Sequence, residues 1–209
     1  MDSLTKNGGA LPEPRTTVQF DGYQERRLRR IADLCRGKSI LDIGYAHKPN
    51  PYYRASVRVG LDLGRPVRPS GYEEEIVGDA LDLGASLGAR RFDSIVAGEL
   101  IEHLENPYAF LRSLRGYLTD DGRVILSTPN PVAWPVILFE LFRSRKYFYS
   151  HDHRYYFTPR WVIRLLEETG YFVEAIVPVG LLPPLGRFVL PCPVALSYQV
   201  IYVGRPRAA

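Results

Sequence analysis

The sequence predicts an α/β protein with a doubly wound, mostly parallel sheet of seven strands that ends in an antiparallel hairpin strand. Two observations lead to this prediction. Short apolar runs recur along the chain, and each ends on an acid, a glycine or a polar turn. Segments with helical spacing separate the first five runs, which favours parallel strands, whereas the last two runs are joined by a loop alone.

The first apolar run organises the others. Residues 38–44 read Lys-Ser-Ile-Leu-Asp-Ile-Gly, with a strand expected from Ser39 to Ile43. At the carboxyl end of a parallel strand the chain turns sharply, and Gly44 permits a positive φ and a close approach of backbone N–H groups to a ligand. Because open α/β sheets bind ligands in that crevice, the Asp42-x-Gly44 sequence predicts a binding edge.

The remaining elements follow the same logic. Further parallel strands are expected over residues 58–63, 75–79, 92–96 and 122–128, and the two final strands over residues 171–179 and 197–203. Helices are expected over residues 21–36, 107–118 and 159–169. Their amino ends carry capping residues, namely Asp21 with Gln24, Asn106 before a proline, and Thr158. Residues 45–51 contain two prolines and an asparagine and predict a shaped loop.

Composition limits the class of protein. The chain has 209 residues, 45% of them apolar, and a formal net charge of +4. We expect residues 1–17 to form a flexible tail and residues 18–209 to form a single domain. No apolar run is long enough to span a bilayer, and the two cysteines, Cys35 and Cys192, fit no metal or redox spacing, so a cytoplasmic location is expected.

Basic residues gather in two places, within residues 26–36 and within residues 143–154. The first group lies on a helix that is polar over most of its surface and is interpreted as a solvated face. The second is interleaved with aromatic residues. No nucleic-acid partner is expected, because the net charge is small and no recognisable nucleic-acid motif is present.

The spacing from Asp42 to Asp62 also fits a nicotinamide-binding domain. A third strand that ends in its own acid, Gly78-Asp79-Ala80, and the terminal hairpin argue against a dehydrogenase. Together with residues 92–104 and 122–130, these features resemble the class I S-adenosylmethionine-dependent methyltransferases, which have a Rossmann-like fold. The resemblance extends from residue 38 to residue 170.

The resemblance implies a set of cofactor contacts. Asp62 would bind the two ribose hydroxyls, Asp79 with Ala80 would frame the adenine, and the loop at Gly44 would lie beside the methionine moiety. The full set of cofactor-binding residues is Asp42, Gly44, Tyr45, Asp62, Leu63, Asp79, Ala80 and Glu99. The family usually carries Asp-x-Gly-x-Gly-x-Gly, whereas here Tyr-Ala-His-Lys follows Gly44. Either the loop has a different shape, with Asn50 or Tyr45 making the contact, or the cofactor binds weakly.

A second group of residues carries acid–base or metal chemistry. Glu99, Glu102 and His103 have helical i, i+3, i+4 spacing just after the fourth strand, and His153 lies before the last helix. His153 is preferred to His151 because the family pattern begins there. The group resembles the Glu-x-x-Glu-His sequence of small-RNA 2′-O-methyltransferases, where it holds a cation, and of ubiquinone-pathway O-methyltransferases. The four residues therefore predict a divalent metal site, and the two histidines are also candidates for a catalytic base, for substrate contacts or for packing.

These inferences predict an enzyme, a methyltransferase that uses S-adenosylmethionine and acts on a small or medium-sized acceptor. The expected reaction is O-methylation of a glycan, lipid-linked or natural-product hydroxyl, with residues 131–158 as a lid over the acceptor, although an ordinary core helix is an equal alternative for the apolar stretch there. Two alternatives remain open: a non-catalytic binding module, and a metal-dependent RNA 2′-O-methyltransferase. The sequence does not define the oligomeric state.

Overall fold

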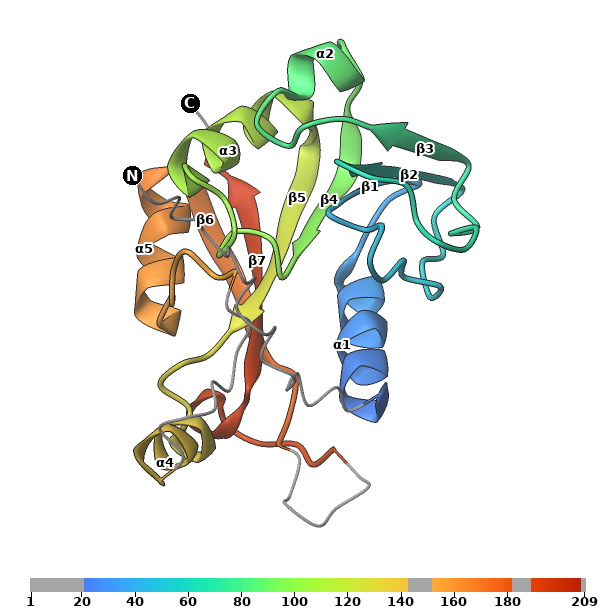
Figure 1. The fold of residues 1–209 in the computed structure, drawn as a ribbon. Coiled ribbons are helices and arrows are strands. Elements are labelled where there is room, and N and C mark those ends of the chain that lie inside the picture. Colours follow the sequence, from blue (N-terminus) through green and yellow to red (C-terminus); the bar gives the residue numbers. More distant parts are fainter. Residues whose placement is uncertain (1–20, 143–151, 182–188, 208–209) are drawn as a thin grey trace, which may run out of the picture.

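The computed structural model describes residues 21–142, 152–181 and 189–207. Its centre is one seven-stranded sheet (Figure 1). The strands lie in the order β3 (Glu74–Val77), β2 (Val57–Asp62), β1 (Ser39–Ile43), β4 (Phe92–Gly98), β5 (Leu118–Pro129), β7 (Gln199–Pro206) and β6 (Tyr171–Pro178). The first five strands of the chain pair in parallel, and β7 runs antiparallel to both β5 and β6. The predicted fold class is therefore confirmed.

The register brings the carboxyl ends of the parallel strands to one edge. Ile43 at the end of β1 lies opposite Leu61 of β2 and Ala97 of β4. We call this edge, toward which the arrowheads of β4 and β5 point in Figure 1, the carboxyl edge, and the opposite edge the amino edge. Loops that follow β1, β2, β3 and β4 therefore meet at the carboxyl edge.

Strand β5 begins earlier than the sequence predicts. It starts at Leu118 rather than Gly122, because Leu118 pairs with Phe92 of β4 before the register shifts between Phe92 and Ser94. Strand β7 extends to Pro206, three residues beyond the predicted end. At a register shift, a strand includes extra residues that break the alternation of apolar and polar side chains. The sequence pattern therefore does not identify them as part of the strand.

The helices are α1 (Asp21–Leu34), α2 (Leu83–Leu87), α3 (Pro107–Leu114), α4 (Trp134–Phe142) and α5 (Pro159–Glu168), with 3₁₀ turns at Arg115–Tyr117 and Val194–Leu196. Asn106 caps α3 as predicted, since its side chain accepts a hydrogen bond from the Ala109 amide at 2.9 Å. The predicted side-chain cap at Thr158 is wrong: its hydroxyl accepts no hydrogen bond from the backbone N–H groups of the first turn of α5. Pro159 at the first helical position presets the backbone there instead.

The core has two layers, one on each face of the sheet. Helix α1 covers one face, where Ile31 packs with Val96 and Ile125. The other face is covered by α2, α3 and α5, and its core residues include Ile95, Val124, Leu87, Leu111 and Leu165. Adjacent residues such as Ile95 and Val96 serve opposite layers because side chains alternate along a strand.

Helix α4 stands apart from both layers. It lies beyond the arrowheads of β4 and β5 in Figure 1. Val136 is its buried residue, whereas Leu141 and Phe142 are 70% and 82% exposed, so α4 is not the core helix considered as an alternative. The predicted tail, residues 1–17, and residues 143–151 of the predicted lid fall outside the described residues. Within the described ranges, no helix has the length and apolarity needed to cross a bilayer.

The packing predicts that truncating two different leucines to alanine has clearly different effects on stability. Leu111 on α3 is fully buried in the larger core layer, and Leu111→Ala should lower the free energy of unfolding by about 2–5 kcal/mol because it leaves a cavity. The matched control Leu141→Ala, on the exposed side of α4, should change it by less than about 0.5 kcal/mol. Urea unfolding measures both, and equal effects would contradict this assignment of the core.

Candidate functional site

Acidic residues follow four neighbouring strands at the carboxyl edge. Asp42 lies in β1, Asp62 ends β2, Asp79 follows β3, and Glu99 follows β4. Backbone hydrogen bonds fix these strand ends, from the Gly44 amide to Leu61 and from the Gly78 amide to Asp62, each 2.9 Å long. The acids share an edge but differ in their surroundings.

Asp42 is enclosed by two tyrosines. Its carboxylate is 7% exposed and accepts hydrogen bonds from the Tyr72 hydroxyl at 2.7 Å and the Tyr53 hydroxyl at 3.0 Å. Burial raises the pKa of Asp42 to about 6, although the two hydroxyls and the charge of Arg27 act in the opposite direction. Asp42, a predicted cofactor contact, therefore faces the protein interior.

Tyr45 shapes the loop after β1. Its side chain is 2% exposed and stacks on Tyr72 with ring centroids 5.2 Å apart. A Cβ at Gly60 would lie 2.5 Å from the Tyr45 ring, so β2 needs a glycine there to admit the ring. Asn50, the other residue expected to contact a ligand in this loop, is 1% exposed and donates to the Leu28 carbonyl.

Asp62 is held by backbone groups but keeps acceptor capacity. Its carboxylate accepts from the Ala46 amide at 2.9 Å and from the Gly64 amide at 3.3 Å. A carboxylate offers about four acceptor positions, so two remain for a ligand. Ala46 occupies the second glycine position of the family pattern, and the contact uses its backbone N–H, which alanine supplies as well as glycine.

The residues beyond β2 and β3 differ in exposure. Asp79 is exposed and accepts from the Leu81 amide at 2.8 Å, and Leu63 is 74% exposed. Ala80 is buried. Gly44 has a φ of +77°, and a Cβ there would lie 3.2 Å from Leu100. The turn after β1 therefore has the positive φ for which the sequence predicts a glycine.

Glu99 belongs to a network that the sequence did not indicate. Its two carboxylate oxygens accept from the Ser127 hydroxyl at 2.9 Å and the Gln199 amide at 2.6 Å. Arg27 of α1, 6% exposed, donates to the same Ser127 hydroxyl at 3.0 Å. The interpretation of the early arginines as a wholly solvated face is therefore wrong for Arg27. The i, i+4 series Tyr23, Arg27, Ile31 is the signal that places it on the buried face.

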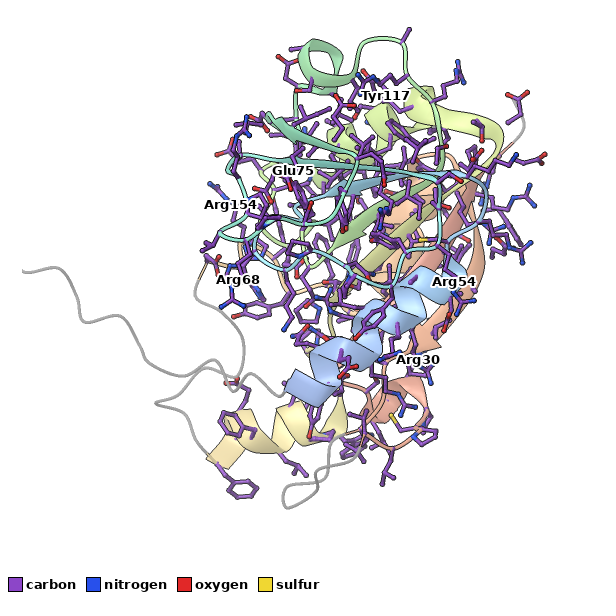
Figure 2. All side chains as sticks on the ribbon, turned by 90° about the vertical axis from the view of Figure 1, so that its right-hand side faces the viewer. Arg30, Arg54, Arg68, Glu75, Tyr117 and Arg154 are labelled. Carbon is purple, nitrogen blue, oxygen red and sulfur yellow. The ribbon has the colours of Figure 1, made fainter. Side chains whose placement is uncertain are left out.

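Three of the four predicted metal ligands lie together. Atoms of Glu102, His103 and His153 that could bind a metal lie within 4.8 Å of one another. The amides of Arg154 and Tyr155 both donate to the Glu102 carbonyl, which holds the segment after His153 against the turn after β4. In Figure 2 the labelled Arg154 lies on the same side as Glu75 of β3, away from Arg54. Glu99 is directed to Ser127 and Gln199, outside this cluster, and His151 falls outside the described residues.

The cluster has unusual electrostatics. Glu102 is 0% exposed, and neither of its carboxylate oxygens makes a hydrogen bond of good geometry with a described residue, although the buried Thr128 hydroxyl lies near enough to oppose the rise of its pKa. Burial, with the charge of Glu99, raises the pKa of Glu102 well above its ordinary value. The rings of His103 and His153 meet edge to face with centroids 4.7 Å apart, and burial with the charge of His103 lowers the pKa of His153 to about 4. A buried, unpaired carboxylate beneath two imidazoles has the chemistry of a cation site or of a proton acceptor.

Comparison with known sequences gives one family and several relatives. The family described as methyltransferase domain matches residues 19–176. A ubiquinone biosynthesis O-methyltransferase of Aeromonas salmonicida is 27% identical over 117 residues, which cover 54% of this chain and 49% of that protein. The mitochondrial ubiquinone biosynthesis O-methyltransferase of Arabidopsis thaliana is 26% identical over 113 residues, 52% of this chain and 35% of that protein. The chain thus matches no more than about half the length of either relative.

Solved structures share the fold. An S-adenosylmethionine-dependent methyltransferase from Thermotoga maritima has a TM-score of 0.67 at 15% identity and covers 87% of each chain. The 1,6-didemethyltoxoflavin-N1-methyltransferase of Burkholderia thailandensis, solved with its acceptor and S-adenosylhomocysteine, has a TM-score of 0.59 at 18% identity over 90% of this chain and 80% of that one. A small RNA methyltransferase, HEN1, has a TM-score of 0.62 at 17% identity over 96% of this chain and 27% of that one.

The enclosure of Asp42 predicts a pH-dependent stability. Its pKa is raised from 3.8 to about 6, so the folded chain holds this proton more tightly than the unfolded chain does. The contribution of Asp42 to the free energy of unfolding should therefore fall as the pH rises from 4 to about 6, by up to about 3 kcal/mol. In Asp42→Asn, where the amide oxygen can accept from both tyrosines without a charge, this decrease should be absent.

Urea unfolding at pH 4.5 and pH 8 measures the effect. Asp42→Asn should gain stability relative to the wild type on going to pH 8, whereas Asp33→Asn, at an exposed position on α1, should not. A difference between Asp42→Asn and the wild type that is the same at both pH values would contradict the prediction.

Proposed function

Since the chain belongs to the methyltransferase-domain family, we propose that it transfers a methyl group from S-adenosylmethionine to a hydroxyl of a small or medium-sized acceptor. One observation carries the proposal. The carboxyl edge combines Asp62, a carboxylate with unused acceptor positions at the end of β2, with a pair of histidines, His103 after β4 and His153 before α5. The first can bind a diol, and the second can accept a proton.

The residues at the carboxyl edge fit the cofactor. The ribose carries two vicinal hydroxyls, and the unused acceptor positions of Asp62 would receive them. Exposed Asp79 would accept from the adenine amino group, with Ala80 and Leu63 against the ring. The backbone at Gly44, kept open by the absence of a side chain, would lie beside the methionine moiety. We assign Asp42 and Tyr45 a supporting role, because both side chains are buried beneath the loop.

The bound cofactor would supply a methyl group already activated on a sulfonium sulfur. The protein must then align the acceptor and remove its proton. We assign this proton to His103 or His153, whose rings lie in contact. His103 or His153 would take the hydroxyl proton as the acceptor oxygen gains the methyl group.

A hydroxyl acceptor is supported by the relatives, which are ubiquinone biosynthesis O-methyltransferases. Within this class we favour a glycan, lipid-linked or natural-product hydroxyl. We propose residues 131–158 as the lid of the acceptor site, since α4 lies beyond the carboxyl edge and exposes Trp134 and Leu138 (Figure 1). Such a surface suits an acceptor with an apolar part.

As an alternative to a histidine base, we propose that Glu102, His103 and His153 hold a divalent cation. The unpaired, buried oxygens of Glu102 support this, because a cation would satisfy a carboxylate that has no described hydrogen-bond partner. The donor set of one carboxylate and two imidazoles suits manganese, iron or zinc. Glu99 is a weaker candidate as a ligand, since both its oxygens already accept hydrogen bonds. A bound cation would lower the pKa of an acceptor hydroxyl.

The metal-binding cluster keeps one alternative function open. A small RNA methyltransferase is among the structures with this fold, so a metal-dependent RNA 2′-O-methyltransferase is the second candidate. The discriminating experiment is to compare methyl transfer from S-adenosylmethionine to RNA oligonucleotides and to small hydroxylated acceptors. Transfer to RNA alone would replace the proposal of a small acceptor.

Asp62 gives a test of cofactor binding. Asp62→Asn should weaken binding of S-adenosylmethionine by about 1.5–3 kcal/mol, because a charged acceptor of two hydroxyl hydrogen bonds is lost. Isothermal titration calorimetry measures this, with Asp33→Asn as the control at an exposed aspartate. Unchanged affinity in Asp62→Asn would contradict the assignment. A wild type that binds neither S-adenosylmethionine nor its demethylated product would favour a non-catalytic binding module.

The cation proposal predicts sensitivity to chelation. Treatment with a chelator should abolish methyl transfer, a single added divalent cation should restore it, and Glu102→Gln should prevent the restoration. The control is Glu105→Gln, since Glu105 is exposed, lies three residues further on and pairs with Arg154. If activity survives chelation, the cation proposal is wrong. In either case His103→Gln or His153→Gln should lower kcat by about 10²-fold or more.

A further inference from the structure

A cavity lies at the amino edge of the sheet, opposite the proposed methyl-transfer site. Its volume is about 300 Å³. We call it the amino-edge cavity, and its lining residues are Arg36, Gly37, Asp93, Asp121, Arg123 and Arg205. They come from the connection between α1 and β1 and from strands β4, β5 and β7. Strands β1, β4, β5 and β7 are neighbours in the strand order, so the cavity lies at the amino edge of the central strands.

Arg123 forms the buried part of this lining. The residue is 5% exposed, and its Nε has no hydrogen-bond partner among the described residues. Its Nη1 lies 3.3 Å from a carboxylate oxygen of Glu174 on β6. A guanidinium has five N–H donors, and a donor buried without a partner costs free energy. Arg123 therefore has unmet hydrogen-bonding capacity at its buried Nε, and its side chain lines the amino-edge cavity.

Two more arginines lie around the same space. Arg36 is exposed and forms no ion pair with any residue that the structure describes, and Arg205 donates to Asp121 at 3.2 Å. Burial lowers the pKa of Arg123, and although Glu174 opposes this shift, the positive charges of Arg36 and Arg205 add to it. The three guanidinium groups are thus close enough to act on one another.

The acids of the cavity do not satisfy Arg123. The Asp93 carboxylate already accepts from the Lys38 amide, from the amide and hydroxyl of Ser39 and from the Thr119 hydroxyl, at 2.8–3.1 Å. The Asp121 side chain is fully exposed, so water and salt screen its charge. Among the described residues, Glu174 is the acid that pairs with Arg123, at 3.3 Å.

We propose that the amino-edge cavity binds a phosphate-type oxyanion, held by Arg123 at its base and by Arg36 and Arg205 at its rim. A phosphate group presents several strong acceptors and pairs well with guanidinium forks. Its oxygens would accept hydrogen bonds from the guanidinium groups of the three arginines that line the cavity. The group is either free inorganic phosphate or the phosphate of a phosphorylated small molecule.

The binding test uses the full chain. Isothermal titration calorimetry with inorganic phosphate at constant ionic strength should show binding to the wild type. Arg36→Gln and Arg123→Gln should each weaken it by about tenfold or more, since each removes a charged hydrogen bond. The matched control is Arg164→Gln on α5, which pairs with Glu168 outside the cavity and should bind phosphate like the wild type.

Nitrogen-15 NMR of labelled arginine provides a direct readout, because the Nε–H resonance of Arg123 should shift as phosphate is added. Repeating the calorimetry with glucose 1-phosphate identifies the source: tighter binding than inorganic phosphate indicates a phosphorylated small molecule, and weaker binding indicates the free ion. If Arg123→Gln fails to fold, the variant Arg36→Gln, at an exposed position, still tests whether the cavity binds phosphate. No binding of phosphate at millimolar concentration, or equal affinity in Arg36→Gln and the wild type, would overturn the proposal.

Discussion

The geometry of the carboxyl edge depends on the hydrogen bonds from Tyr53 and Tyr72 to the buried carboxylate of Asp42. Tyr53 belongs to the loop after β1, and Tyr72 to the connection between β2 and β3. One acid in β1 therefore ties together the two loops that border the proposed cofactor site. The Tyr72 hydroxyl also accepts from the Asn50 amide, which extends the network along the first loop. Burying the carboxylate is costly, as its raised pKa shows, and the hydrogen bonds from the two hydroxyls offset part of that cost.

The same network explains how the loop after β1 can lack the family's second and third glycines. Tyr45 fills the space over Gly60 and stacks on Tyr72, so an aromatic side chain stabilises the loop from below. The backbone of the next residue, Ala46, is thereby held with its N–H on Asp62. Gly60 of β2 has no side chain, and the Tyr45 ring of the loop fills the space that this leaves. The carboxylate that would bind the ribose is thus oriented before any ligand arrives.

Much of the fold could be predicted from the sequence, because strands with apolar runs and helices with caps leave local signals. The five parallel strands, the terminal antiparallel pair and the cap at Asn106 all follow from such signals. The early start of β5 could not be predicted, since it depends on a register shift against β4. The burial of Arg27 could not be predicted, because a charged residue on a largely polar helix normally faces solvent. The cause lies in the tertiary structure: Arg27 donates a hydrogen bond to Ser127 of β5, which is 100 positions away in the chain.

The candidate site shows the limit of spacing arguments most clearly. Helical spacing puts Glu99 on one face with Glu102 and His103, but the chain forms turns after β4, and Glu99 has a φ of +54°. This left-handed backbone is costly for a residue with a side chain, and the hydrogen bonds from Ser127 and Gln199 help to hold it. Glu99 is consequently directed to β5 and β7, while Glu102 enters the interior beneath the histidines without a described partner. Two acids three residues apart therefore have separate tasks: the first fixes the turn, and the second places a buried carboxyl group, whose pKa is raised well above its ordinary value, beside the two histidines.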